Sequence, residues 1–140
     1  MWFDLRGWNV AKLVYTFEYD CGYDPPFPAI EIGVRNPERP QEEIRLTVLI
    51  DSGSDITLLP DDMLRLLNAL YVDRARVRGL FGGSRSLKTY MVQVVVGPHT
   101  IHAVQVGAVF SNDEVVLGRN VLNQLDVTLR GLAGVVEVEA

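Results

Sequence analysis

The sequence predicts a single domain that is mainly β, with one or two short helices, and that folds as a barrel or sandwich. Its 140 residues, 48% hydrophobic and 22% charged, suit one globular domain with a sizeable core. Apolar and polar residues alternate along much of the chain, as from Val10 to Tyr19, and this period of two is typical of β-strands. Clusters of glycine, proline and aspartate separate the alternating segments and favour turns between them.

The expected strands cover residues 10–19, 29–34, 44–50, 71–79, 87–96, 100–110, 115–117, 126–130 and 135–139. A hairpin loop is expected at 35–40, because Pro37 and Pro40 have no N–H to donate to a strand ladder. The strand at 44–50 ends in Val48-Leu49-Ile50, and this fully apolar run predicts burial on both faces.

One helix is expected to begin at about Pro60, after the strand at 44–50. Pro60 suits a first helical turn, and the carboxylates of Asp61 and Asp62 favour the positive end of a helix dipole. An apolar stripe follows at positions i, i+3, i+4 and i+7, which is typical of a helix that buries one face. Its members are Met63, Leu66, Leu67 and Leu70. A second, shorter helix is expected over 120–125.

Charge and composition exclude several classes of function. Thirteen Lys and Arg against 18 Asp and Glu give a net charge of −5, which argues against a nucleic-acid partner. Cys21 is the single cysteine, so it can form neither an internal disulfide nor a thiolate metal site alone. With only His99 and His102 as imidazoles, we expect no metal and no cofactor.

The sequence also predicts no membrane partner. No apolar run approaches the roughly 18 residues that a membrane span needs. Charges at Asp4 and Arg6 stand where a signal peptide would be apolar. We therefore expect a soluble protein of a reducing compartment, the cytoplasm.

The chemistry centres on Asp51, which follows the apolar strand directly and enters a Ser52-Gly53 turn. Burying a carboxylate costs several kcal/mol unless it is paired or hydrogen-bonded. General acid–base catalysis is one reason to place an aspartate there, and Gly53 would let its N–H approach the carboxylate. The alternative is an Asx-turn that merely closes a strand.

Two features favour catalysis over the plain turn. The tripeptide lies between Val48-Leu49-Ile50 and the apolar segment 56–59, so it belongs to the core and not to a surface hairpin. A second apolar-apolar-Gly unit, Val116-Leu117-Gly118, appears later and is followed by Arg119-Asn120.

These motifs, with the glycine-rich segment 79–83 between them, resemble retropepsin-like aspartic proteases in kind and in order. The resemblance covers about Pro28 to Glu139 and implies a closed barrel lobe that works as a homodimer. Asp51 matches the catalytic aspartate, and Ser52 and Gly53 match its neighbours. The substrate-binding tip of the flap would be Leu80, Phe81, Gly82 and Gly83. The supporting residues would be Ser54, Asp55, Gly118, Arg119 and Asn120. Of these, Asp55 and Arg119 match a pair that supports the floor of the active site.

The chain departs from the retroviral pattern at its N-terminal end. We expect residues 1–27 to form an extension, a strand followed by a Gly/Pro loop, and residues 28–140 to form the protease domain. The extension could remodel the dimer interface or occupy the cleft. Before Pro28, where the retroviral type has an arginine that pairs across the dimer, this chain has Phe27, which carries no charge for such a pair.

The mechanism needs two carboxylates, one to take a proton from water and one to give a proton to the scissile carbonyl oxygen. The chain holds a single Asp-Ser/Thr-Gly motif, so a second Asp51 from another copy is expected on a two-fold axis. Ser52 would then hydrogen-bond across the axis. An extended peptide or protein would be the substrate, covered by the hairpin 71–96 acting as a flap.

That hairpin has an unusual charge. Residues 71–90 contain four arginines and one lysine against Asp73, and Arg74, Arg76 and Arg78 share one strand face. One interpretation, which the sequence favours, is a strand edge protected against aggregation. The other is a preference for acidic substrate or partner segments.

Two further functions stay open at this point. One is a dimerisation or peptide-binding module that has the same fold and no catalytic activity. The other is a different β-barrel enzyme or binding domain in which Asp51 is only a turn residue.

Overall fold

The computed structural model describes residues 2–3, 9–10, 13–78, 83–110 and 112–140. Its strands are β1 (Trp2–Phe3), β2 (Asn9–Val10), β3 (Val14–Glu18), β4 (Ala29–Asn36), β5 (Arg39–Ile50), β6 (Thr57–Pro60), β7 (Leu70–Arg78), β8 (Ser84–Val96), β9 (His99–Val109), β10 (Val116–Leu117), β11 (Val127–Arg130) and β12 (Val135–Glu139). Its helices are α1 (Asp61–Leu66) and α2 (Arg119–Leu122).

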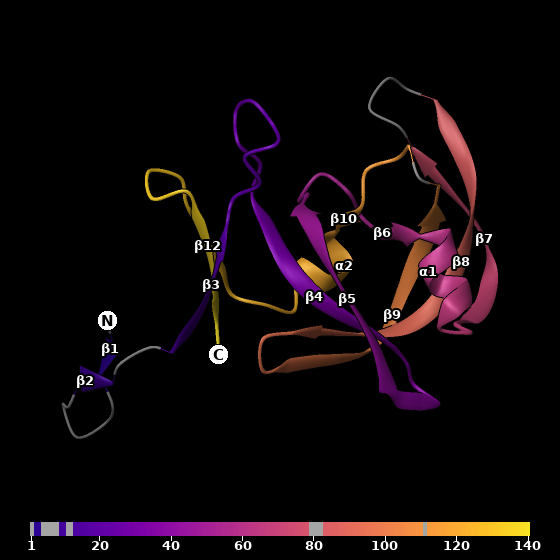
Figure 1. The fold of residues 1–140 in the computed structure, drawn as a ribbon, viewed down its shortest axis with the longest axis horizontal. Helices are drawn as coiled ribbons and strands as arrows, with labels where there is room; N and C mark the ends of the chain where they lie inside the picture. The colour runs from indigo at the N-terminus through magenta and orange to yellow at the C-terminus, as the bar shows by residue number, and fades with distance from the viewer. Residues whose placement is uncertain (1, 4–8, 11–12, 79–82, 111) are drawn as a thin grey trace.

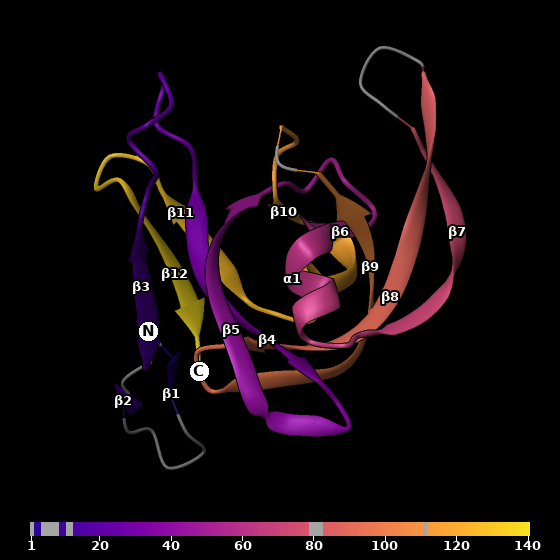
Figure 2. The same cartoon turned by 45° about the vertical axis from the view of Figure 1, so that its right-hand side comes forward.

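Seven strands form one sheet in the order β4-β5-β10-β6-β9-β8-β7, and β4 also pairs with β8. That additional pairing, at Gly33, Val34 and Arg35, brings the sheet back on itself and closes it into a barrel. Figures 1 and 2 show the long strands β4, β5, β8 and β9 curving around the core, with β7 at the far right. The prediction of a mainly β closed barrel with one or two short helices is confirmed, and the described residues form two, α1 and α2.

The core of the barrel is aliphatic. Its largest fully buried side chains are Ile30, Ile32, Leu59, Leu64, Leu67 and Leu117, joined by six valines. Val48 and Leu49 are buried and Ile50 is half-buried, as the apolar run at the end of β5 predicts. This burial holds the last residue of β5 firmly, and Asp51 is the next residue along the chain.

A smaller sheet, in the order β11-β12-β3, lies beside the barrel. β3 pairs along its whole length with β12, from Val14 opposite Glu139 to Glu18 opposite Val135. Beyond the ladder, the Ala140 N–H donates to the Leu13 carbonyl oxygen at 2.9 Å. Part of the segment 1–27 that the sequence sets apart is thus hydrogen-bonded to the last strand of the chain.

The first helix is shorter than its apolar stripe predicts. α1 ends at Leu66, and Asn68 takes a positive φ of 50°, which stops the helix. Leu70 is the first residue of β7 and is exposed, as is Leu66. Pro60 precedes the first turn as the N-cap residue instead of lying in it.

The prediction of a loop over residues 35–40 is also wrong in its extent. β4 continues to Asn36 and β5 begins at Arg39, so the turn is only Pro37 and Glu38. Pro40 lies in the strand because the register shifts between Arg35 and Asn36, and a proline is tolerated at such an irregularity.

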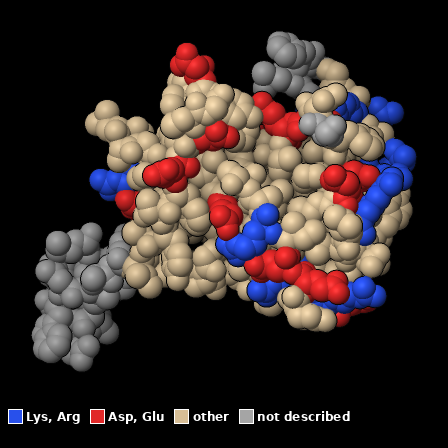
Figure 3. Space-filling model, in the orientation of Figure 1, with Lys and Arg blue, Asp and Glu red and all other residues tan. Residues whose placement is uncertain are grey.

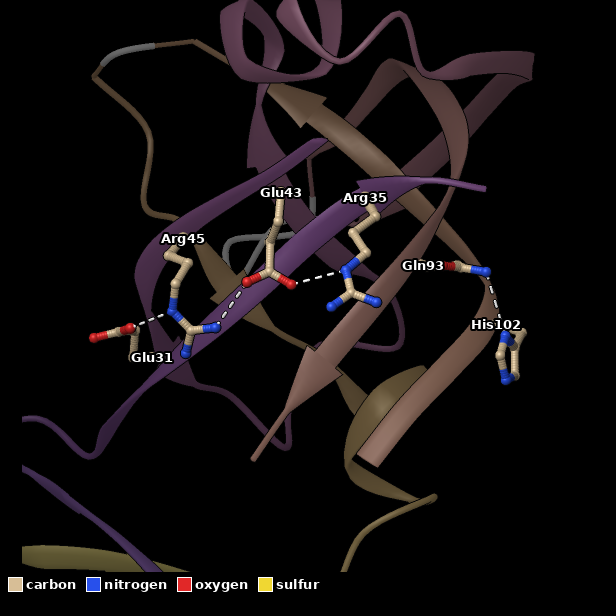
Figure 4. A network of polar contacts seen from close by, with 6 residues as sticks. All are labelled: Glu31, Arg35, Glu43, Arg45, Gln93 and His102. Atoms are coloured by element: carbon tan, nitrogen blue, oxygen red, sulfur yellow. Dashed lines mark hydrogen bonds and ion pairs between the residues drawn. The ribbon is translucent and has the colours of Figure 1, made fainter. Parts of the chain in front are cut away.

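Charged side chains tie β4 to β5 on the outside of the barrel (Figure 4). Arg45 donates to Glu31 at 2.6 Å and to Glu43 at 2.9 Å, and Glu43 also accepts from Arg35 at 2.8 Å. Partial burial alone would raise the pKa of Glu43, but the hydrogen bonds from Arg45 and Arg35 outweigh it and lower that pKa. The Glu43 carboxylate lies over Gly33, where a Cβ atom would come within 2.6 Å of it.

Candidate active site

The loop that carries Asp51 connects β5 to β6 and passes around the end of β10. β10 is inserted between these two strands, parallel to β5 and antiparallel to β6. The ladder reaches Asp51 itself, whose N–H donates to the Leu117 carbonyl oxygen at 3.1 Å. The candidate catalytic residue is therefore fixed by a strand from a distant part of the sequence.

The Asp51 carboxylate is half-buried and faces its own turn. Its Oδ1 accepts a hydrogen bond from the Gly53 N–H at 2.9 Å, and the Ser54 N–H donates to the Asp51 carbonyl oxygen at 3.2 Å. A Cβ atom at Gly53 would lie 3.1 Å from Oδ1, so glycine allows this approach. Within the described residues the Gly53 N–H is the one hydrogen-bond partner of the Asp51 side chain.

Two groups of Arg119 hold the rest of the loop. Its N–H donates to the Ser54 carbonyl oxygen at 2.8 Å, and its guanidinium Nη1 donates to the Ser52 carbonyl oxygen at 2.7 Å. The Ser54 hydroxyl donates to the Ile56 carbonyl oxygen at 2.6 Å. The side chain of Ser52 is exposed and makes no hydrogen bond in the described part of the chain.

Thr57 and Asn120 form a second, buried connection between the two motifs. Asn120 Oδ1 accepts from the Thr57 N–H at 3.0 Å and from the Thr57 hydroxyl at 2.8 Å. The same hydroxyl accepts from the Gly118 N–H at 3.0 Å. Asn120 Nδ2 donates to the Gln105 carbonyl oxygen at 2.8 Å, so the network also reaches β9.

Gly118 lies where two backbone segments touch. A Cβ atom there would stand 2.5 Å from the Ile56 carbonyl oxygen and 3.0 Å from the Ser54 carbonyl oxygen. Both atoms belong to the backbone and cannot turn aside as a flexible side chain could. Any side chain at position 118 would therefore push the Asp51 loop away from β10.

The structure brings most of the sequence-predicted site residues together, but it does not pair Asp55 with Arg119. Asp55 is exposed and lines a surface hollow with Ile56 and Gln105. No ion pair or hydrogen bond of its carboxylate occurs within the described ranges. Arg119 uses its guanidinium on the Ser52 carbonyl oxygen instead.

The hairpin expected as a flap is formed by β7 and β8, which extend from the barrel beyond the Asp51 loop (Figures 1 and 2). Of the four tip residues named from the sequence, Leu80, Phe81 and Gly82 lie outside the described residues. Gly83 is exposed, and a Cβ atom there would have no neighbour within 4 Å. Near this end of the hairpin, Arg85 makes two contacts to Asp113, at 3.1 and 3.3 Å.

Phe27 is part of an apolar cluster beside the loop. Its ring packs edge-on against Tyr23, with ring centroids 5.2 Å apart. Both rings lie against Ala29, Leu49 and Val116, and Leu49 belongs to β5, whose last residue precedes Asp51. Partial burial, followed by the nearby carboxylates of Glu114 and Asp20, raises the pKa of Tyr23.

The remaining candidates lie away from Asp51. His102 Nδ1 is 3.3 Å from the Gln93 side chain on the outer face of β8 and β9 (Figure 4). His99 Nε2 is 2.6 Å from the Glu139 carbonyl oxygen. Cys21 is exposed in the loop before β4. Among the described side chains, no three His, Cys, Asp or Glu gather as a metal-binding group.

Sequence reasoning missed Thr57 and Gln105 as parts of this site. Thr57 is fully buried, and its hydroxyl both donates and accepts within the network. The sequence does contain a signal for Thr57, because its hydroxyl is the one polar side-chain group in the apolar run Ile56-Thr57-Leu58-Leu59. A hydroxyl buried in such a run needs hydrogen-bond partners from elsewhere in the chain. Gln105 contributes a backbone carbonyl, and no sequence pattern marks that contact.

No helix in the described part of the chain has the length and apolarity needed to cross a lipid bilayer.

Comparisons with protein-family models and with curated proteins give no match. Among solved structures, the chain resembles a retropepsin-like aspartic protease from Rickettsia conorii with a TM-score of 0.60 at 12% identity. That match covers 94% of this chain and 96% of the other. The chain also resembles the EIAV protease, complexed with an inhibitor, with a TM-score of 0.53 at 18% identity over 70% of this chain and 86% of the other. These similarities show that the fold is retropepsin-like.

Proposed function

We propose that this chain is an aspartic endopeptidase that acts as a symmetric homodimer, with Asp51 of each copy forming one active site. The observation that carries the proposal is the position of Asp51. A buried strand delivers it to an exposed turn, where Gly53 binds one carboxylate oxygen and β10 fixes the backbone. The retropepsin-like fold supports the assignment.

The second carboxylate comes from the partner copy. The chain has one Asp-Ser/Thr-Gly motif, and Ser52 and Gly53 beside it are exposed and available for contact with the same turn of a second copy. Two carboxyl groups about 3 Å apart cannot both ionise, so the pair shares one proton and titrates as a unit. A two-fold axis through the loop gives both groups equivalent surroundings.

Peptide hydrolysis then follows from one shared proton. The ionised carboxylate takes a proton from a water molecule as the water oxygen bonds to the scissile carbonyl carbon. The protonated carboxyl gives its proton to the carbonyl oxygen. The carboxyl that took the water proton then gives it to the amide nitrogen, and the other carboxylate takes a proton from a hydroxyl of the tetrahedral intermediate. The C–N bond breaks to leave an amine and a carboxylic acid, and the pair again holds one shared proton. An extended peptide would bind by strand addition, and closure of the β7–β8 hairpin over it would exclude water.

Cleavage of a peptide library at mildly acidic to neutral pH, by the wild type and by Asp51→Asn, tests the proposal. We expect cleavage by the wild type alone. Equal cleavage by both proteins would identify a contaminant. A folded dimer that cleaves nothing would favour the alternative, a catalytically silent dimerisation or peptide-binding module with this fold.

A mixing experiment tests the shared site directly. Wild-type and Asp51→Asn chains are unfolded together, refolded and assayed at several ratios. If each site needs Asp51 from both chains, activity follows the square of the wild-type fraction, because only wild-type dimers are active. A linear dependence would place the whole site within one chain and contradict the dimer mechanism.

A further inference from the structure

One face of the β7–β8 hairpin carries a row of cations, which we call the basic stripe: Arg74, Arg76, Arg78 and Lys88. The register places Arg74 opposite Lys88, Arg76 opposite Ser86 and Arg78 opposite Ser84, so all these side chains project from the same face. Figure 3 shows blue side chains gathered along the right-hand edge, over β7. The four cations are exposed.

The cations of the basic stripe have no acidic partner within the described residues. Arg76 donates to the Ser84 hydroxyl at 3.1 Å, which leaves its charge uncompensated. By contrast, neighbouring Arg65 pairs with Asp61 at 3.0 Å, and Arg85 on the opposite face of the hairpin pairs with Asp113. The one acidic residue of the hairpin, Asp73, accepts from the Thr89 hydroxyl at 2.8 Å and is engaged there.

Protection of a sheet edge does not account for this arrangement. Edge protection needs charged side chains on the strand, but it does not need like charges to stand opposite each other. Here Arg74 lies directly opposite Lys88, and like charges in directly opposite positions destabilise a sheet. The repulsion is relieved when an anion binds between them, which is the behaviour of a binding surface.

The geometry of the stripe fits an extended polypeptide. Alternate side chains on a strand are about 6.6–6.8 Å apart, so Arg74, Arg76 and Arg78 match carboxylates at alternate positions of an extended segment. β7 is also an edge strand, which in the described part of the chain pairs with β8 alone. Its second edge can accept another strand through backbone hydrogen bonds.

We propose that the basic stripe is a docking site for an acidic, extended polypeptide segment that adds along β7. A polypeptide is favoured over a nucleic acid for two reasons. The chain as a whole is acidic, with a net charge of −5, which repels a long polyanion. The stripe also lies on an edge strand, where a polypeptide can pair through its own backbone hydrogen bonds and a nucleic acid cannot.

The position of the stripe gives the docking site its role. It lies on β7 and β8, which in the described part of the chain do not pair with β5, the strand that leads to Asp51. If the proposed function holds, the stripe selects substrates that carry acidic residues outside the bond to be cleaved. That role rests on the proposed function, whereas binding of the acidic segment does not.

Binding is tested in the full-length Asp51→Asn variant, which cannot cleave the probe. The probe is a fluorescent peptide with glutamate at alternate positions, Thr-Glu-Thr-Glu-Thr-Glu-Thr, followed by fluorescence anisotropy. We expect binding that weakens as salt is raised from 50 to 500 mM, because exposed charge pairs are screened. Replacing Arg74, Arg76 and Arg78 together by glutamate should weaken binding about tenfold or more, from the loss of three exposed charge pairs.

Arg39→Glu is the matched control, since Arg39 is an exposed cation of β5 with no acidic partner among the described residues. This variant should bind as before. A glutamine peptide of the same length should not bind. If the glutamate substitutions disturb folding, glutamine at the same three positions tests the same charges.

Three results would overturn the proposal: no binding of the glutamate peptide, an equal loss in Arg39→Glu, or tighter binding of an oligothymidylate with the same charge. Failure of the proposed function is separate from these results. It would appear as a wild-type protein that binds the acidic peptide and cleaves no peptide at all.

Discussion

The guanidinium of Arg119 donates a hydrogen bond to the Ser52 carbonyl oxygen at 2.7 Å and so fixes the residue next to Asp51. The two residues are 67 positions apart in the sequence. In the same loop, the backbone N–H of Arg119 binds the Ser54 carbonyl oxygen. One residue thereby holds the turn at two points, on both sides of Gly53.

Replacing Arg119 by alanine should therefore affect the turn more than the fold. The lost hydrogen bond is charge-assisted but exposed, so we expect the free energy of unfolding to fall by about 1 kcal/mol. We expect peptide cleavage to fall about tenfold, because the turn next to Asp51 is held less firmly. A tenfold fall corresponds to a rise of about 1.4 kcal/mol in the activation free energy. Arg130→Ala, which removes an exposed ion pair with Glu137 in the small sheet, is the control. An unchanged kcat in Arg119→Ala would show that the anchor does not position Asp51.

Gly118→Ala should destabilise the protein by about 2–4 kcal/mol, because the new Cβ atom meets the Ile56 backbone at 2.5 Å. Gly131→Ala is a matched control, since a Cβ atom at Gly131 would have no neighbour within 4 Å. We expect its effect to stay within about 0.5 kcal/mol. Urea unfolding of both variants measures the difference, and similar values would contradict the close approach of the two backbones.

The Arg85–Asp113 ion pair predicts a specific pH dependence. The hydrogen bond from Arg85 is the main cause that lowers the pKa of Asp113 in the folded chain. The pair therefore stabilises the fold above the ordinary aspartate pKa of about 3.9, and this contribution is lost as pH falls through the lower, folded-state pKa. In Asp113→Asn, the free energy of unfolding should decline less steeply below about pH 4 than in the wild type.

Urea unfolding at a series of pH values measures that slope. NMR titration of the Asp113 carboxyl gives an independent check, because its pKa should rise toward the ordinary value in Arg85→Gln. If the free energy of unfolding falls equally steeply below about pH 4 in the wild type and in Asp113→Asn, the ion pair contributes nothing to stability.

Two neighbouring leucines of α1 should differ sharply in their effect on stability. Leu64 is fully buried in the barrel, whereas Leu66 is 75% exposed. Leu64→Ala should cost about 2–5 kcal/mol from lost burial and the cavity left behind. Leu66→Ala should change the free energy of unfolding by less than about 0.5 kcal/mol. Thermal unfolding of the two variants measures the difference. Equal shifts of their unfolding midpoints from that of the wild type would mean that α1 packs through a different face.

The same leucines show where sequence patterns reach their limit. The spacing of Met63, Leu66, Leu67 and Leu70 correctly predicts that a helix exists. It fails on length, because Asn68 ends the helix and Leu70 belongs to β7. A periodic pattern records which residues are apolar but cannot show where the chain changes direction.

The strands and the barrel could be predicted because period-two alternation and turn residues are local signals. The closure of the barrel through β4 and β8, and the insertion of β10 beside β5, are contacts between distant segments that leave no local pattern. The candidate site, whose residues remain predictions, divides in the same way. The candidate residues Asp51, Gly118 and Asn120 follow from their motifs, whereas the contribution of Thr57 appears only when two distant segments meet.

The insertion of β10 between β5 and β6 also sets the order in which the chain can fold. Asp51 reaches its final position only after residues 116–120 arrive, since these supply its backbone partner and those of Ser52, Ser54 and Thr57. Closing loops of this length is slow compared with forming local hairpins. During synthesis, the turn at Asp51 therefore emerges from the ribosome before the residues that order it, and it stays without these partners until residues 116–120 have emerged as well.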